Sequence, residues 1–107
     1  DSQAGFWDGS KEFLQAINNV NKLNRRNVIR VVAPLIMKSK RDIVLMGVDN
    51  DVDFAKTWTC YEGREQACGE CTACSSRIQG FIEAKLIDPI PYSKPIPWEQ
   101  FDCKPIE

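Results

Sequence analysis

The chain has 107 residues, with 14 basic and 15 acidic side chains and a formal net charge of −1. This length corresponds to one small domain or to part of a larger one. The hydrophobic fraction of 43% excludes a disordered chain, and the near-neutral charge argues against a broadly basic nucleic-acid surface. No apolar run reaches the roughly 20 residues that a membrane span requires. We therefore expect a globular, cytoplasmic protein that binds neither nucleic acid nor a membrane.

The chain contains no histidine, which removes Ser-His-Asp triads, Cys-His pairs and His-ligated metals from consideration. Any acid–base chemistry falls to Asp, Glu, Lys, Tyr or Cys side chains. The sequence begins at Asp1, without methionine or a signal peptide, so we expect a processed chain or a fragment.

The first half of the chain predicts two helices and one strand. Ser10 caps a helix whose apolar residues recur at helical spacing, and the β-branched run over 28–32 predicts a buried strand. Ser39 caps a second helix from Lys40 to Met46, and Gly47 ends it. The acidic residues over 49–53 lack the glycine and glutamate of a calcium loop, so we interpret them as a solvated loop.

The second half predicts one more helix and an extended tail. The helix begins at Ala73 or Cys74 and continues to about Lys85. Five of the six prolines lie between Pro89 and Pro105, which favours an extended arm. Four apolar side chains could anchor this arm: Tyr92, Ile96, Trp98 and Phe101.

Four of the five cysteines lie close together, in a C-x7-C-x2-C-x2-C pattern formed by Cys60, Cys68, Cys71 and Cys74. Four thiolates complete the ligand shell of a closed tetrahedral zinc site, and Gly63 and Gly69 suit turns whose N–H groups donate to sulfur. The first alternative is an iron–sulfur cluster, although the ferredoxin pattern continues with a C-x3-C-P that is absent here. The second alternative is that the four cysteines are reduced thiols or form disulfides. The remaining cysteine, Cys103, has no predicted role.

Three segments resemble the C-terminal region of the 7-cyano-7-deazaguanine synthase family. The strongest, from Thr57 to Tyr92, matches the family's T-W-S-C-Y, C-G-x-C-x-x-C-x-x-R and A-F-x-x-A-G-x-x-D-P motifs. Its matching residues are Thr57, Trp58, Cys60, Tyr61, Cys68, Gly69, Cys71, Cys74, Arg77, Phe81, Ala84, Asp88 and Pro89. Weaker matches lie upstream, at 33–44 and at Gly5, Phe6, Asp8, Glu12 and Phe13.

The resemblance implies an ATP-dependent ligase of queuosine precursor biosynthesis. Such an enzyme activates the carboxylate of 7-carboxy-7-deazaguanine with ATP, forms an amide with ammonia and dehydrates the amide to the nitrile preQ0. It implies an α/β fold of the adenine-nucleotide α-hydrolase type, with a parallel sheet flanked by helices, and zinc held by the four cysteines. ATP, with Mg²⁺, is the implied co-substrate, and Lys40, in the first turn of its helix, is the implied phosphate contact.

The family's phosphate-binding loop, S-G-G-x-D-S, is absent from this chain. We therefore expect a C-terminal portion of the enzyme that is inactive alone, with residues 1–56 belonging to the nucleotide-binding domain and 57–107 forming the knuckle, helix and arm. A homodimer is a further expectation. A stand-alone zinc-knuckle module and a small iron–sulfur protein are the alternative functions. Arg77 is expected to donate to knuckle carbonyls or to an acid such as Glu70, and Trp58 and Tyr61 are expected to shield the knuckle from solvent.

Overall fold

The computed structural model describes residues 5–24 and 26–107. They fall into two compact units, Asp1–Ser39 and Lys40–Glu107, which are called unit 1 and unit 2 and are described separately. Three α-helices are present among the described residues: α1 (Lys11–Asn21), α2 (Lys40–Asp49) and α3 (Thr72–Glu83). The described residues also form short 3-10 helices: η2 (Trp7–Gly9), η3 (Phe54–Lys56) and η4 (Trp98–Phe101).

In unit 1, α1 begins where its sequence predicts. The Ser10 hydroxyl accepts a hydrogen bond from the Phe13 N–H at 3.1 Å, which satisfies one of the helix's unpaired N-terminal donors. The indole of Trp7, in η2, meets the Phe13 ring edge-on, with 4.8 Å between ring centroids. The ring contact fixes the direction in which the chain enters α1.

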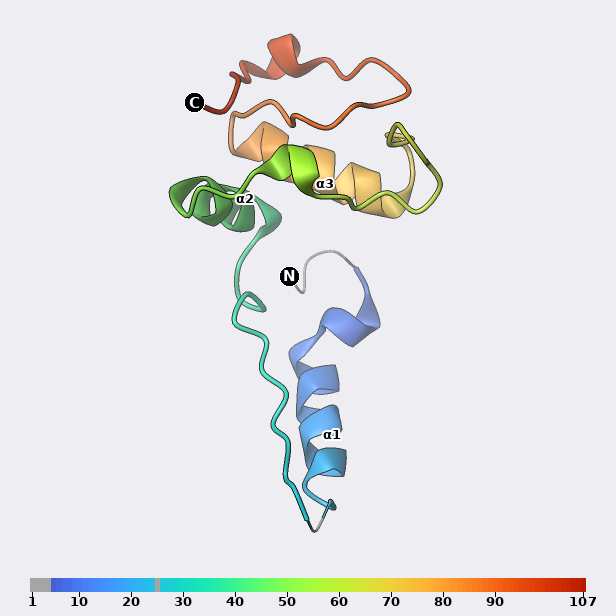
Figure 1. The fold of residues 1–107 in the computed structure, drawn as a ribbon, viewed down its shortest axis with the longest axis vertical. Helices are drawn as coiled ribbons and strands as arrows, with labels where there is room; N and C mark the ends of the chain where they lie inside the picture. The colour runs from blue at the N-terminus through green and yellow to red at the C-terminus, as the bar shows by residue number, and fades with distance from the viewer. Residues whose placement is uncertain (1–4, 25) are drawn as a thin grey trace. The chain divides into compact units, whose positions relative to one another are not determined.

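The segment over 28–32 runs as an extended trace alongside α1 (Figure 1). It is not a buried strand, so that prediction is wrong for this structure. The only pairings between extended segments among the described residues are two isolated bridges elsewhere, and Val28, Ile29 and Val32 are 64%, 65% and 65% exposed. A strand needs a neighbouring strand to satisfy its backbone, and unit 1 supplies none. The predicted parallel sheet stays a prediction.

In unit 2, α2 continues beyond Gly47, where the sequence predicts its end. Asp51, with a φ of 57°, takes the left-handed position instead, and the Val52 N–H reaches back to the Gly47 carbonyl at 2.9 Å. A methyl group at Gly47 would overlap the Phe54 ring. The glycine therefore serves close packing against η3, and the helix ends one turn later.

The helix α3 is the centre of unit 2, and α2 packs against it (Figure 1). Phe81 of α3 is 1% exposed and meets the Phe54 ring edge-on, with 5.3 Å between centroids. The helix begins at Thr72 and ends at Glu83, close to the predicted bounds. Lys85, with a φ of 61°, then reverses the chain.

The C-terminal segment is not an extended arm. After α3 it folds back, and single parallel bridges pair Tyr92 with Ala67 and Lys104 with Leu86. Ile90 and Cys103 are buried in this segment. The predicted anchors dock on unit 2 itself: Tyr92, Ile96 and Trp98 are half-buried, whereas Phe101 stays 40% exposed.

None of the described helices combines the length and the apolar character needed to cross a bilayer. The boundary predicted after residue 56, between the nucleotide-binding domain and the knuckle, helix and arm, stays a prediction.

Candidate metal centre

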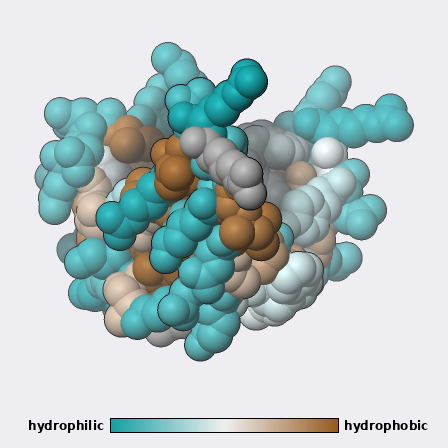
Figure 2. Space-filling model, turned by 90° about the horizontal axis from the view of Figure 1, so that it is seen from below, coloured by the Kyte–Doolittle hydropathy of each residue, from teal (hydrophilic) through white to brown (hydrophobic). Residues whose placement is uncertain are grey.

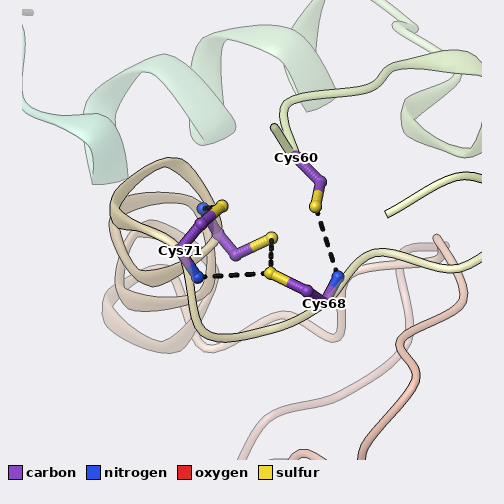
Figure 3. A group of neighbouring side chains, drawn as sticks. Cys60, Cys68 and Cys71 are labelled. Carbon is purple, nitrogen blue, oxygen red and sulfur yellow. Dashed lines mark hydrogen bonds between the residues drawn. The ribbon is translucent and has the colours of Figure 1, made fainter. Parts of the chain in front are cut away.

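The four cysteines of the predicted site come together in unit 2. Their Sγ atoms all lie within 4.8 Å of one another. Cys60 follows η3, Cys68 lies in the loop before α3, and Cys71 is the N-cap of α3 (Figure 3). Cys74 lies in the first turn of α3. The cysteines reach one point because α3 starts directly after the Cys68–Cys71 turn, so its first turn directs both of its sulfurs towards the loop.

Backbone N–H groups surround the sulfur atoms. Cys60 Sγ accepts hydrogen bonds from the Gly63 N–H at 3.1 Å and the Cys68 N–H at 3.3 Å. Cys68 Sγ accepts from the Cys71 N–H at 3.2 Å, and Cys71 Sγ from the Cys74 N–H at 3.4 Å (Figure 3). Such donors stabilise negative charge on sulfur and orient it before a metal arrives.

These hydrogen bonds and the burial of the sulfurs give the cysteines different thiol pKa values. The Cys68 N–H is the main cause that lowers the pKa of the Cys60 thiol to about 6, and backbone donors from Tyr61 and Cys74 lower the pKa of Cys71. Burial raises the pKa of Cys74 to about 12. The backbone donors therefore favour the thiolate form at Cys60 and Cys71, whereas burial favours the thiol form at Cys74. Metal binding must displace the Cys74 proton, which makes metal affinity dependent on pH.

The distances between sulfurs fit a metal ion. A tetrahedral zinc ion with bonds of about 2.3 Å separates its sulfur ligands by about 3.8 Å. The Sγ atoms of Cys68 and Cys74 are 4.0 Å apart. Cys60 and Cys74 are buried, and Cys68 and Cys71 are partly covered. The described residues contain no other group of His, Cys, Asp or Glu side chains that could hold a metal ion.

A buried ion pair lies beside the cysteines, one that the sequence did not predict. Arg77, one turn after Cys74, donates to Asp88 through Nε at 2.5 Å and through Nη2 at 2.9 Å. Its guanidinium also donates to Thr59 Oγ1 at 3.0 Å and to the Phe54 carbonyl at 3.3 Å. The side chains of Arg77 and Asp88 are 7% and 0% exposed. Arg77 thus donates to an acid as expected, but that acid is Asp88 and not Glu70, which pairs with Lys94 at the surface.

Asp88 joins this ion pair to the C-terminal segment. Its carboxylate also accepts from the Tyr92 hydroxyl at 2.6 Å and the Ile90 N–H at 3.2 Å. The Ala67 N–H in turn donates to the Pro91 carbonyl at 2.9 Å, and the Ser93 N–H donates to the Ala67 carbonyl at 2.8 Å. Ala67 is the residue before Cys68, so a continuous set of hydrogen bonds links α3 to the loop ligands.

Lys40, the predicted phosphate contact, is the first residue of α2. Its stem rests on α3 at Gly80, where a methyl group would overlap Lys40 Cγ. Burial, aided by the charge of Arg77, lowers the pKa of Lys40. The side chain borders a cavity of about 200 Å³ lined also by the hydroxyl-bearing Thr57 and Thr59 and by Arg77.

The aromatic pair around Cys60 shields the knuckle less than predicted. Trp58 is 45% exposed and Tyr61 67% exposed, and the Trp58 Nε1–H donates to the Cys60 carbonyl at 3.0 Å. Cys103 is buried apart from the four-cysteine group, which agrees with its exclusion from the site.

The sequence matches the family described as "Queuosine biosynthesis protein QueC" over residues 1–85. The chain belongs to the QueC family. Among curated QueC relatives, the 7-cyano-7-deazaguanine synthase of Marinomonas sp. is 40% identical over 85 residues, covering 79% of this chain and 39% of the relative. The enzyme of the same name from Thermoplasma volcanium is 40% identical over 95 residues, covering 85% and 39%. That from Caldicellulosiruptor saccharolyticus is 38% identical over 93 residues, covering 87% and 41%.

The chain thus spans about two fifths of the length of these QueC relatives and matches their C-terminal portion. No solved structure gives a significant match. The resemblance seen in the sequence is confirmed at the level of the family, and the four-cysteine group lies within the matched residues.

Proposed function

We propose that this chain is the C-terminal portion of an ATP-dependent 7-cyano-7-deazaguanine synthase. The complete enzyme joins ammonia to 7-carboxy-7-deazaguanine and dehydrates the resulting amide to the nitrile. A carboxylate is a poor electrophile, so ATP, with Mg²⁺, must convert its oxygen to a leaving group before ammonia attacks. The observation that carries the proposal is the family match over residues 1–85, together with the convergence of four cysteines inside it.

We assign the metal as zinc with a structural role. Cys60, Cys68, Cys71 and Cys74 fill all four positions of a tetrahedral shell, so no position is left for water or substrate. A four-thiolate site also accepts iron, and metal analysis with a visible spectrum separates the two metals. One equivalent of zinc in a colourless protein supports the assignment, whereas iron with visible absorbance overturns it.

Lys40 is the residue of this chain that we propose for ATP phosphate. An anion beside a partly buried ammonium stabilises its charged form, and Lys40 borders a cavity with Thr57 and Thr59 in its lining. The N-terminus of α2 favours an anion as well. These groups support a phosphate contact at the face where α2 meets α3.

The test is a fusion that joins the N-terminal portion of the Marinomonas sp. synthase to this chain in place of the matched region. With ATP, Mg²⁺, ammonia and 7-carboxy-7-deazaguanine, we expect the fusion to release preQ0, detected by mass spectrometry, and the chain alone to release none. In the fusion, Lys40→Ala should raise the KM for ATP by about tenfold or more, the loss of one charge-assisted contact. Lys38→Ala is the matched control, since Lys38 is an exposed lysine two residues earlier.

A fusion that is folded and loaded with zinc but forms no product would contradict the synthase assignment. Equal KM values for the two lysine variants would remove Lys40 from the phosphate site without affecting the rest of the proposal.

A further inference from the structure

The four cysteines of unit 2 pack against side chains from three parts of the chain. Ala67 precedes Cys68 in the loop before α3, Ile78 lies on α3, and Ile90 and Tyr92 belong to the C-terminal segment. The loop and α3 also supply metal ligands. Among the described residues of this cluster, those of the C-terminal segment are therefore the ones that cover the cysteines without belonging to a ligand-bearing element.

Residues 90–96, here called the cover segment, are attached by their backbone to the loop that carries Cys68. The Ala67 N–H donates to the Pro91 carbonyl at 2.9 Å, and the Ser93 N–H donates to the Ala67 carbonyl at 2.8 Å. The segment passes beside this loop, next to the sulfur ligands (Figure 3). Both polar groups of the residue before a ligand are thus paired with the cover segment.

Side chains add further attachments, each of them small. The stem of Lys94 lies against Gly69, where a methyl group would be 3.0 Å from Lys94 Cε. Lys94 Nζ lies 3.7 Å from the Glu70 carboxylate, in a pair whose side chains are 44% and 74% exposed. The Tyr92 hydroxyl donates to Asp88 at 2.6 Å. A segment held by a few such contacts can open locally while the elements around it stay folded.

The chain that follows the cover segment has an attachment of its own, so opening can stay local. The Ile87 N–H donates to the Lys104 carbonyl at 2.8 Å, and the Lys104 N–H donates to the Lys85 carbonyl at 3.0 Å. Neither bond involves the cover segment. Pro91 and Pro95 restrict the backbone of the segment, which reduces the conformational entropy lost each time it closes.

We propose that the cover segment controls exchange of the metal at the four cysteines, which is retained while the segment is closed and becomes accessible when it opens. A chelator must reach the ion or its sulfur ligands to displace them, and the apolar shell of a metal site controls that access. The inference rests on the metal assignment of the proposed function. It concerns residues beyond the family match, which ends at residue 85.

The test follows transfer of zinc from the loaded chain to the chromogenic chelator 4-(2-pyridylazo)resorcinol. Ser93→Pro removes the N–H that donates to Ala67 and should accelerate the transfer about tenfold or more. Ser93→Ala is the matched control, because it keeps that N–H at an exposed position, and its rate should stay within about twofold of that of the unaltered chain. Equal transfer rates in the two variants, each carrying one zinc, overturn the proposal.

Amide hydrogen exchange of the unaltered, zinc-loaded chain, measured by NMR, tests the same proposal without a variant that must fold. The amides of Ala67 and Ser93, whose hydrogen bonds join the loop to the cover segment, should exchange about tenfold or more faster than those of Cys68 and Cys71, which donate to ligand sulfurs. Equal protection of all four amides would show that the segment opens only with the whole site, and overturns the proposal.

Metal analysis separates this inference from the assignment on which it rests. One zinc per chain, together with equal transfer rates or equal amide protection, removes the role of the cover segment and retains the metal assignment. A chain that binds no zinc overturns both.

Discussion

The two units of the chain bury their residues to very different degrees. Every buried residue among those described lies in unit 2, around α3 and the four cysteines. Unit 1 has a well-formed helix with a side-chain cap, but its aliphatic residues remain exposed. The comparison shows that short helices of similar length are stabilised differently in the two units. Unit 2 combines the four-cysteine group with a buried ion pair, whereas unit 1, described by itself, leaves its aliphatic side chains exposed (Figure 2).

Removal of the metal should produce the largest difference in stability between the two units. Apparent binding free energies for structural zinc are about 10–16 kcal/mol, so Cys74→Ser or chelation should abolish cooperative unfolding of unit 2. The signals of α1 in unit 1 should persist, as monitored by NMR. Cys103→Ser is the control and should retain one zinc per chain, because Cys103 lies outside the metal group. Intact unit 2 signals after complete zinc removal would contradict a structural role.

The buried ion pair should have the next largest effect. Asp88→Asn leaves the Arg77 charge buried without its partner, and breaking such a pair costs about 3–5 kcal/mol. The free energy of unfolding of unit 2, measured with urea, should fall by that amount. Lys56→Gln breaks an ion pair with Asp53 in which both side chains are mostly exposed, and should change stability by less than about 1 kcal/mol. Similar losses in both variants would argue against the network described around Asp88.

High pH should weaken unit 2 through Tyr92. Burial and the hydrogen bond to Asp88 raise the pKa of Tyr92 above its ordinary value of 10.0. Above about pH 10 the unfolded chain releases this proton while the folded chain keeps it, so the free energy of unfolding falls as pH rises, by up to about 1.4 kcal/mol per pH unit. Tyr92→Phe should lose about 1 kcal/mol at neutral pH and show a shallower decline. Parallel urea-midpoint profiles of the two proteins through this range would refute the assignment.

The smallest effect should be confined to unit 1. Ser10→Ala removes the cap of α1 and should cost that helix about 1 kcal/mol. Helical signal from α1 should decrease while the urea midpoint of unit 2 stays constant, because the hydrogen bond of the cap joins two residues of unit 1. Ser10→Asp, which keeps an acceptor at the cap, should restore the signal. A shift in the unit 2 midpoint would show that the two units unfold together.

The metal group was predictable from the sequence because its ligands are close together in the chain. Cys68, Cys71 and Cys74 are separated by two residues each, so a turn and the first turn of a helix suffice to bring them together. The cap at Ser10 and the start of α3 are local features too, and both were predicted within one or two residues. The family resemblance rested on the same region and is confirmed.

Predictions failed where the outcome depended on contacts distant in sequence. Gly47 looks like a helix terminator, but the Phe54 ring packs where its side chain would be, and α2 continues. Arg77 has acidic residues nearer in sequence than Asp88, and only the return of the chain after α3 brings that carboxylate under the guanidinium. The apolar anchors of the proline-rich tail predicted that it docks, but only the structure shows where, with Tyr92 paired with Ala67 beside the four cysteines.

By itself, the sequence determined the family, the four cysteines of the metal group and the helices, because each depends on residues within a few positions of one another. Only the tertiary structure decided which charges are buried together, how the tail closes on α3 and that the aliphatic run over 28–32 is exposed. The physical reason is that burial and backbone pairing are properties of two segments at once. A β-branched run specifies a preference for pairing, and the partner determines whether the preference is met.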